Sequence, residues 1–97
     1  SFGLRSIVLT HIPTLFLVQG KSAIQVDAGI HHPDLIRDLL KRFNGHVYFH
    51  YNFWCNIDSD PNPKLCAEIR KRYNLEEIAS GREQKYEYGL YKISLKN

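Results

Sequence analysis

The segment from Pro33 to Gly45 constrains the fold more than any other part of the chain. Its apolar residues recur three or four positions apart, which is typical of an amphipathic helix with one apolar stripe. Pro33 suits the first helical position, where a backbone N–H would have no partner, and Asn44-Gly45 is typical of a helix end. The stripe consists of Leu35, Ile36, Leu39, Leu40 and Phe43. The segment therefore predicts a helix that covers a core.

Strand-like segments surround this helix on both sides. Strands are predicted for residues 4–10, 14–19, 22–27, 46–54 and 85–95, from their β-branched and aromatic content and its alternation. The short turn at Gly20-Lys21 predicts a hairpin between the second and third strands. A second helix is predicted for residues 63–73 and a short helical turn for residues 74–79. The order β-β-β-α-β-α-β predicts a two-layer α+β sandwich. Its sheet would be mixed and mainly antiparallel, with about five strands and two helices on one face.

The length of the chain predicts one domain over residues 1–97. Because the chain starts at Ser1 and contains no Met, we also expect it to be a piece of a longer protein. Cys55 and Cys66 form no C-x-x-C pair, so we expect two reduced, partly buried thiols in an intracellular protein. No apolar run is long enough to span a membrane, and we expect no membrane partner.

The aromatic stretch from His46 to Trp54 divides into two unlike faces if it is a strand, because strand side chains alternate. One face would carry Val47, Phe49, Tyr51 and Phe53, and the other His46, Tyr48, His50, Asn52 and Trp54. The last strand divides in the same way, with Tyr86, Tyr88, Lys92 and Lys96 on its polar face. If both polar faces point the same way, the open side of the sheet is aromatic and basic.

An open aromatic face with a net charge of +3 predicts nucleic-acid binding. Rings stack on unpaired bases with about 1–3 kcal/mol each, which favours single-stranded RNA or DNA. Stacking is predicted for Tyr48, Trp54, Tyr86 and Tyr88, and contact with phosphates or base edges for Lys92, Lys96 and His50. Aromatic residues are also enriched at protein interfaces. The alternative is therefore a module that binds another protein, or its own copy, through the same face.

A small His-dependent hydrolase or nuclease is a third hypothesis, with His11 or His50 as the candidate base and Asp27 as a candidate partner at the end of the sheet where His11 lies. We expect binding rather than catalysis, and no cofactor. His46 and His50 would lie about 13 Å apart on a strand, too far to share one metal ion, so no metal site is predicted. Asp58 to Asn62 resembles half of a calcium loop but lacks its later Gly and Glu, so we interpret it as an ordinary turn.

Overall fold

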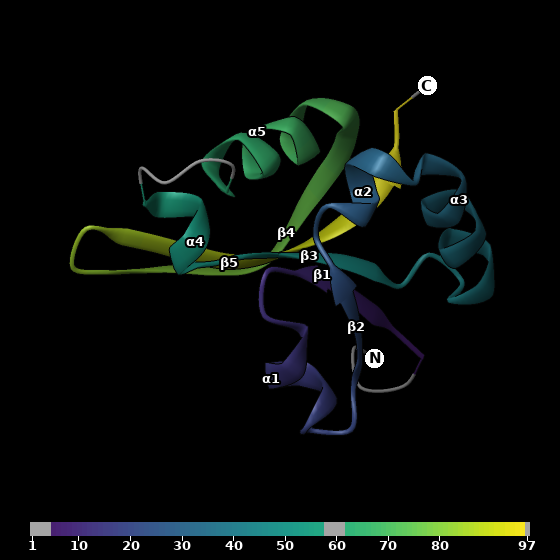
Figure 1. Ribbon diagram of the computed structural model, residues 1–97, viewed down its shortest axis with the longest axis horizontal. Helices are drawn as coiled ribbons and strands as arrows, with labels where there is room; N and C mark the ends of the chain where they lie inside the picture. The colour runs from purple at the N-terminus through teal and green to yellow at the C-terminus, as the bar shows by residue number, and fades with distance from the viewer. Residues whose placement is uncertain (1–4, 58–61, 97) are drawn as a thin grey trace.

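Five strands form one mixed sheet in the computed structural model of the protein, which describes residues 5–57 and 62–96. The strands are β1 (Ile7–Thr10), β2 (Ser22–Gln25), β3 (Val47–Tyr51), β4 (Tyr73–Glu83) and β5 (Tyr86–Leu95). They lie in the order β2-β1-β3-β5-β4 (Figure 1). β1 is parallel to β2 and β3, whereas β5 is antiparallel to β3 and β4. The predicted α+β class with a mixed sheet of about five strands is confirmed.

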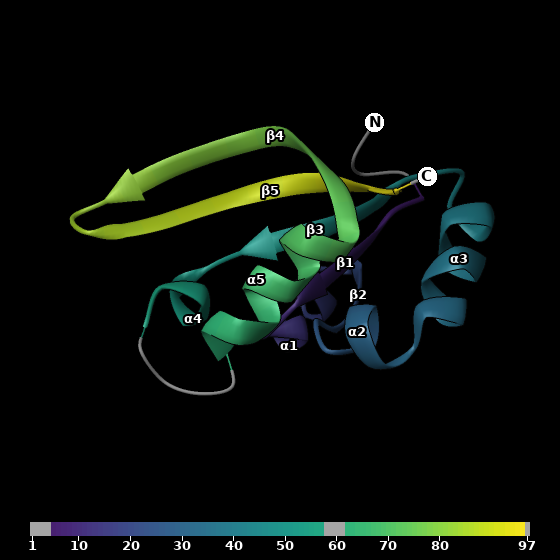
Figure 2. The ribbon, with the colours of Figure 1, turned by 90° about the horizontal axis from the view of Figure 1, so that it is seen from above.

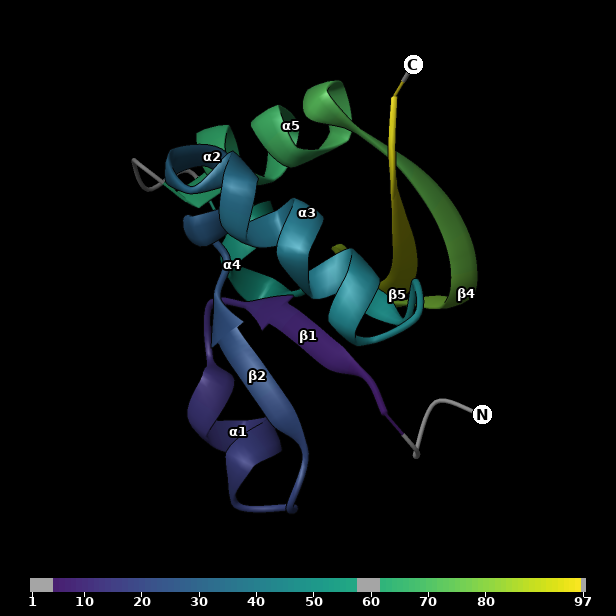
Figure 3. The same cartoon turned by 90° about the vertical axis from the view of Figure 1, so that its right-hand side faces the viewer.

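Helices lie on both sides of this sheet. They are α1 (Pro13–Leu17), α2 (Ala28–His31), α3 (Pro33–Arg42), α4 (Phe53–Asn56) and α5 (Asn62–Arg72). α2, α3 and α5 lie on one side and α1 on the other (Figures 1 and 3). The hairpin of β4 and β5 extends beyond α4 and α5 (Figure 2). No helix in the described part of the chain is long and apolar enough to cross a membrane.

The core lies between the sheet and helices α3 and α5. The largest of its fully buried residues come from three strands and both helices: Leu9, Phe49, Ile93, Ile36 and Ile69. α3 ends where the sequence predicts, because Asn44 and Gly45 adopt φ angles of 56° and 83°. Such left-handed residues stop a helix and turn the chain back, here into β3. The predicted helix is therefore confirmed in extent, and Ile36 and Leu39 of its stripe are buried, whereas Leu35 is exposed.

The strand predicted for residues 14–19 is wrong, and with it the hairpin to β2. Pro13 instead begins α1, in the first-turn position that suits proline. β2 runs parallel to β1, so the chain must return along the strand pair before β2 begins, and α1 makes that crossover. None of the residues of α1 is buried. Its Leu15 and Leu17 are about half exposed, so this apolar run does not lie inside a sheet.

The strand predicted for residues 46–54 ends at Tyr51. Asn52 caps α4 there, because its Oδ1 accepts a hydrogen bond from the backbone N–H of Trp54 at 3.0 Å. Trp54 therefore lies on a helix, and its side chain does not follow the alternating pattern of β3.

The helical turn predicted for residues 74–79 is also wrong. These residues belong to β4, an edge strand that pairs with β5 along its whole length. A bulge interrupts the register between Glu77 and Ala79. The predicted turn at residues 58–62 falls mostly outside the described residues, and Asn62 begins α5.

Candidate functional site

The carboxyl ends of the neighbouring parallel strands β1 and β3 lead directly into polar residues. His11 follows β1 and Asn52 follows β3. The connection from β1 to β2 runs through α1 on one side of the sheet. The connection from β2 to β3 runs through α2 and α3 on the other side (Figure 3). This point of divergence is where sheets with parallel strands commonly place a ligand, which makes it a candidate site.

Asn52 organises this site through its side-chain amide, and the residue is only 5% exposed. Its Oδ1 accepts from the backbone N–H of Trp54 at 3.0 Å. Its Nδ2 donates to the backbone carbonyl of His50 at 2.9 Å and contacts Nδ1 of His11 at 3.1 Å. The two backbone partners fix which end of the amide carries nitrogen, since an N–H needs an acceptor and a carbonyl needs a donor. Nδ1 of His11 is therefore an acceptor, and the proton of the neutral ring lies on Nε2.

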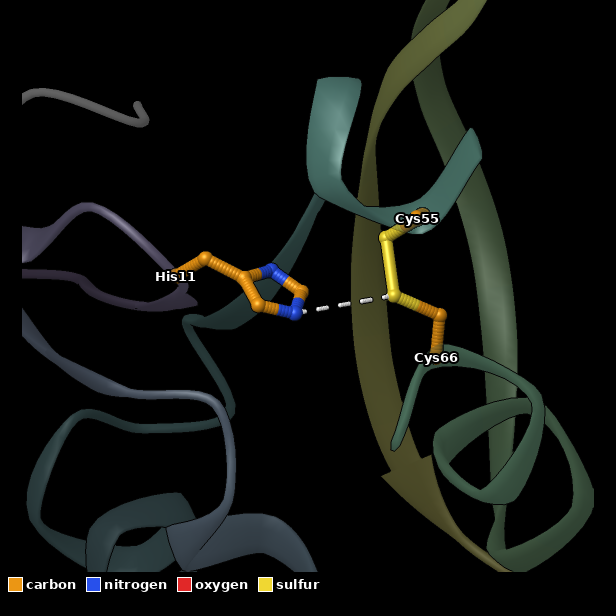
Figure 4. Close-up of side chains that lie close together, drawn as sticks. All are labelled: His11, Cys55 and Cys66. Atoms are coloured by element: carbon orange, nitrogen blue, oxygen red, sulfur yellow. Dashed lines mark hydrogen bonds between the residues drawn. A yellow bond between two sulfur atoms is a disulfide. The ribbon is translucent and has the colours of Figure 1, made fainter. Parts of the chain in front are cut away.

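Nε2 of His11 points at a disulfide bond (Figure 4). Cys55 on α4 and Cys66 on α5 are joined, and Nε2 lies 3.9 Å from Sγ of Cys66. The prediction of two reduced thiols is wrong here, because the two helices bring the Cα atoms to 5.7 Å, a normal disulfide separation. Disulfides persist mainly in oxidising compartments, so this bond is an argument against the predicted intracellular location. The location itself stays a prediction.

The ligand atoms of His11, Cys55 and Cys66 lie within 4.8 Å of one another, a grouping also found in metal sites. The hydrogen bonds do not suit a metal ion. A metal-bound histidine usually donates its other ring N–H to an acceptor, whereas Nδ1 of His11 faces the donating Nδ2 of Asn52. We therefore interpret the cluster as a disulfide with an adjacent N–H donor.

His50 lies on β3 beside this cluster and is held by two contacts. Its Nδ1 is 2.9 Å from Oγ1 of Thr10, and its ring meets the ring of Phe16 edge-on at 5.2 Å. Burial lowers the pKa of His11. Burial and then the nearby His11 lower the pKa of His50. Both imidazoles are therefore held in the neutral form at neutral pH.

These lowered pKa values predict that the protein loses stability as the pH falls below about 6.5. Between the folded and unfolded pKa values the unfolded chain binds more protons, so acid favours unfolding. Urea unfolding from pH 4 to pH 8 measures the effect. Replacing both residues (His11→Gln with His50→Gln) should flatten the profile, whereas His32→Gln, at an exposed imidazole, should leave it unchanged. An equal slope in the double variant would contradict this assignment.

The structure brings only two of the three candidate catalytic residues together. Asp27 is exposed at the start of α2 and takes no part in the hydrogen bonds of this cluster, whose residues are all described. A general base needs an open nitrogen, and Nδ1 of His11 is already engaged by Asn52. The sequence reasoning missed Asn52 as the organising residue. Its signal was the preference of asparagine for the position before a helix.

The predicted polar faces of the last strand and of β3 do point the same way. Tyr48 pairs with Lys92 and His50 with Leu90 across the β3–β5 ladder, and directly opposed residues share a face. The exposure predicted for Tyr48 is wrong, because Tyr48 is buried and its hydroxyl lies 3.3 Å from Nδ1 of His46. α1 also covers part of this face by placing Phe16 against His50.

Two other predicted ligand-binding residues lie away from this face. Trp54 is on α4, where its ring meets that of Phe53 edge-on at 5.6 Å. Lys96 follows β5 and lines a separate hollow of about 490 Å³ with Arg70 and Tyr91. Tyr91 packs against the core, so that hollow lies on the helix-covered side. Of the residues predicted to bind nucleic acid, the open face thus retains His50, Tyr86, Tyr88 and Lys92.

Two hollows adjoin at Tyr88. The first, of about 320 Å³, is a groove lined mainly by Phe16, His50, Ala79, Tyr88 and Leu90. The second, of about 340 Å³, is lined by Phe53, Glu83, Gln84, Tyr86, Glu87 and Tyr88 near the end of the β4–β5 hairpin. The ring of Tyr88 lies over Gly81 on β4, where an added Cβ would come within 2.6 Å of its hydroxyl oxygen. Gly81 therefore leaves room for the ring that separates the hollows.

The second hollow is lined by rings and acidic residues, and two cationic side chains lie against that lining. The rings of Phe53 and Tyr86 lie 5.1 Å apart. The ammonium of Lys85 lies 5.6 Å from the centre of the Tyr86 ring, and Arg82 forms an ion pair with Glu87. The Tyr86 ring thus has one cation near it, and aromatic faces attract positive charge.

Comparison with known proteins adds no relationship to this geometry. No family model, curated protein or solved structure matches the chain.

Proposed function

We propose that this chain is a protein-binding module whose two hollows receive neighbouring side chains of a partner. An apolar side chain would enter the groove beside Phe16, and a basic side chain would enter the hollow beside Tyr86. The observation that carries the proposal is that Tyr88 lines both hollows. One short segment that carries an apolar and a basic residue therefore reaches both.

The groove suits an apolar side chain because Phe16, Ala79 and Leu90 are part of its lining. Burial of apolar surface contributes about 25 cal/mol per Å², and this gain does not depend on charge. The helix α1, which contributes Phe16 to the groove, also exposes Leu15 and Leu17, and the next residue, Val18, is 75% exposed. Exposed apolar residues gathered beside an apolar groove are typical of a protein interface.

The second hollow suits a cation better than a phosphate. Both of its charged lining residues, Glu83 and Glu87, are acidic. Arg82 pairs with Glu87, which leaves the carboxylate of Glu83 to meet an incoming cation. Aromatic faces attract ammonium and guanidinium groups by about 0.5–2 kcal/mol. A nucleic acid stacked on the same rings would bring its phosphates towards these carboxylates, which is why we favour a protein partner over the nucleic-acid alternative.

Lys85 provides a test that separates the two ligand classes by sign. Its ammonium competes with an incoming basic side chain for the Tyr86 ring, so Lys85→Ala should strengthen binding of a cationic peptide. The same change removes a positive charge and should weaken binding of an oligonucleotide. The measurement is Trp54 fluorescence, since the Trp54 ring contacts Phe53 in the wall of the hollow. The probes are a blocked Leu-Lys peptide and a single-stranded oligonucleotide.

We expect the peptide to bind the unmodified protein and the oligonucleotide to leave the fluorescence unchanged. Tyr86→Ala should weaken peptide binding about 2–30-fold, the equivalent of one cation–π contact. Lys71→Ala, at an exposed lysine of α5, is the matched control for Lys85→Ala and should change nothing. Quenching by the oligonucleotide that weakens with Lys85→Ala would contradict the proposal. So would dimerisation of the protein that blocks the peptide, because a second copy would then occupy the groove.

A further inference from the structure

We propose that the disulfide between Cys55 and Cys66 exchanges with thiols in the folded protein, with the N–H of His11 stabilising the Cys66 thiolate as it leaves. This activity lies at the carboxyl ends of β1 and β3 and is independent of the peptide-binding hollows. Three observations carry it: the disulfide, the 3.9 Å approach of Nε2 to Cys66 Sγ, and the hydrogen bonds of Asn52.

The hydrogen bonds of Asn52 decide what His11 can do. Because Nδ2 of Asn52 points at Nδ1, the proton of the neutral ring lies on Nε2, towards the sulfur. Protonation of Nδ1 would set two donors against each other, and burial also lowers the pKa of His11. The ring therefore stays neutral and keeps its Nε2 proton. It acts as a fixed hydrogen-bond donor to the developing thiolate, and hydrogen bonds to an ionised acceptor are the strong ones.

The two sulfurs are not equivalent. Cys66 faces His11, whereas Cys55 lies on the four-residue helix α4, whose Phe53 and Trp54 are exposed (Figure 4). Of the two residues, Cys55 is the more exposed, at 7% against 2% for Cys66. Attack at Cys55 leaves the negative charge on Cys66, where the N–H donor is placed. A thiol of lower pKa is the better leaving group, so the geometry favours this direction.

An external dithiol supplies the two electrons that reduction of the disulfide requires. Its thiolate attacks Sγ of Cys55 and forms a mixed disulfide, while the bond to Cys66 breaks and its electron pair remains on Sγ of Cys66. That thiolate accepts a hydrogen bond from His11 and later takes a proton from water. The second thiolate of the reductant then attacks the mixed disulfide. It releases Cys55 as a thiolate and closes the reductant into a ring disulfide, so two electrons have passed to the protein.

The first test is reduction of the intact chain by dithiothreitol without denaturant, followed by alkylation and mass measurement of the thiols. We expect a rate that rises with the dithiothreitol concentration and exceeds the rate of global unfolding. His11→Phe should slow reduction about tenfold, since a hydrogen bond to a charged group is lost. His11→Gln retains an N–H donor on its side chain and should restore part of the rate. His32→Phe, at an exposed histidine, is the matched control and should leave the rate unchanged.

A second measurement separates thiolate stabilisation from a structural role of His11. In Cys55→Ser, Cys66 is a single thiol whose pKa follows from the pH dependence of its alkylation. We expect this pKa to be lower than in the same variant with His11→Phe added. The other ionisable side chains of α5 are the same in both variants and cancel in the comparison. They are Lys64, Glu68, Arg70, Lys71 and Arg72.

Three outcomes would overturn the proposal. Reduction only at the rate of global unfolding would show a disulfide that is closed to thiols in the folded state. Equal Cys66 pKa values with and without His11 would show that the imidazole does not act on the thiolate. Tight binding of Zn²⁺ by the reduced protein, abolished by His11→Phe, would make Nε2 a metal ligand and not an N–H donor.

Discussion

Phe49→Ala is expected to lower the free energy of unfolding by about 3–5 kcal/mol. Phe49 is fully buried near the middle of β3, the central strand of the sheet. Its ring meets that of Tyr51 edge-on at 6.2 Å and lies 6.5 Å from that of Tyr91. Removing it leaves a cavity between the sheet and helices α3 and α5. Domains of this size are stable by only about 5–15 kcal/mol, so the loss is a large part of the total.

Phe53→Ala is the matched control, because the sequence alternation places Phe49 and Phe53 on one face of a single strand. In the structure Phe53 is on α4 and 48% exposed. We expect its replacement to change stability by about 1 kcal/mol or less, since surface substitutions usually have small effects. Urea unfolding of both variants measures the difference. Equal losses would mean that residue 53 is buried as the strand pattern predicts, and would contradict the placement of α4.

The contrast between these two phenylalanines shows which parts of the fold local patterns can predict. The helix from Pro33 and the start of β3 have patterns that agree with their tertiary surroundings, and both are confirmed. Local patterns predicted the wrong structure for α1 and for the first residues of β4. α1 is apolar on all sides, and a short apolar run does not distinguish helix from strand. What decides it is the parallel pairing of β1 with β2, which is a contact between distant residues.

The candidate site was predictable in part for the same reason. His11 and His50 are both candidate bases in the sequence, and the structure places them next to each other, because Asn52 Nδ2 contacts His11 and donates to the carbonyl of His50. The disulfide could not be predicted, because a separation of eleven residues does not say whether two helices will bring the sulfurs together. Tyr48 shows the opposite error. Alternation gave its side of the sheet, but the packing of neighbouring side chains buries it.

Asn52→Ala is expected to lower the free energy of unfolding by about 2–4 kcal/mol. Loss of the cap on α4 contributes about 1 kcal/mol. The carbonyl of His50 also loses its partner, and a buried group in that state costs about 1–3 kcal/mol. Nδ1 of His11 adds little, because His11 is only partly buried and water replaces the lost contact. Asn74→Ala is the matched control, because Asn74 is exposed and makes one long hydrogen bond of 3.3 Å to Leu95. We expect that control to change stability by about 0.5 kcal/mol or less.

The same variant tests the assignment of the proton on His11. Nitrogen NMR of the imidazole should show the proton on Nε2 in the unmodified protein, because Asn52 donates to Nδ1. In Asn52→Ala that constraint is removed. Nδ1 can then accept a proton, so the pKa of His11 should rise towards its ordinary value and the N–H facing Cys66 should become only partly populated. Reduction of the disulfide should then slow in Asn52→Ala even at temperatures where the variant is fully folded. An unchanged tautomer and an unchanged reduction rate would mean that Asn52 supports the fold alone, and that the orientation of His11 is set by other contacts.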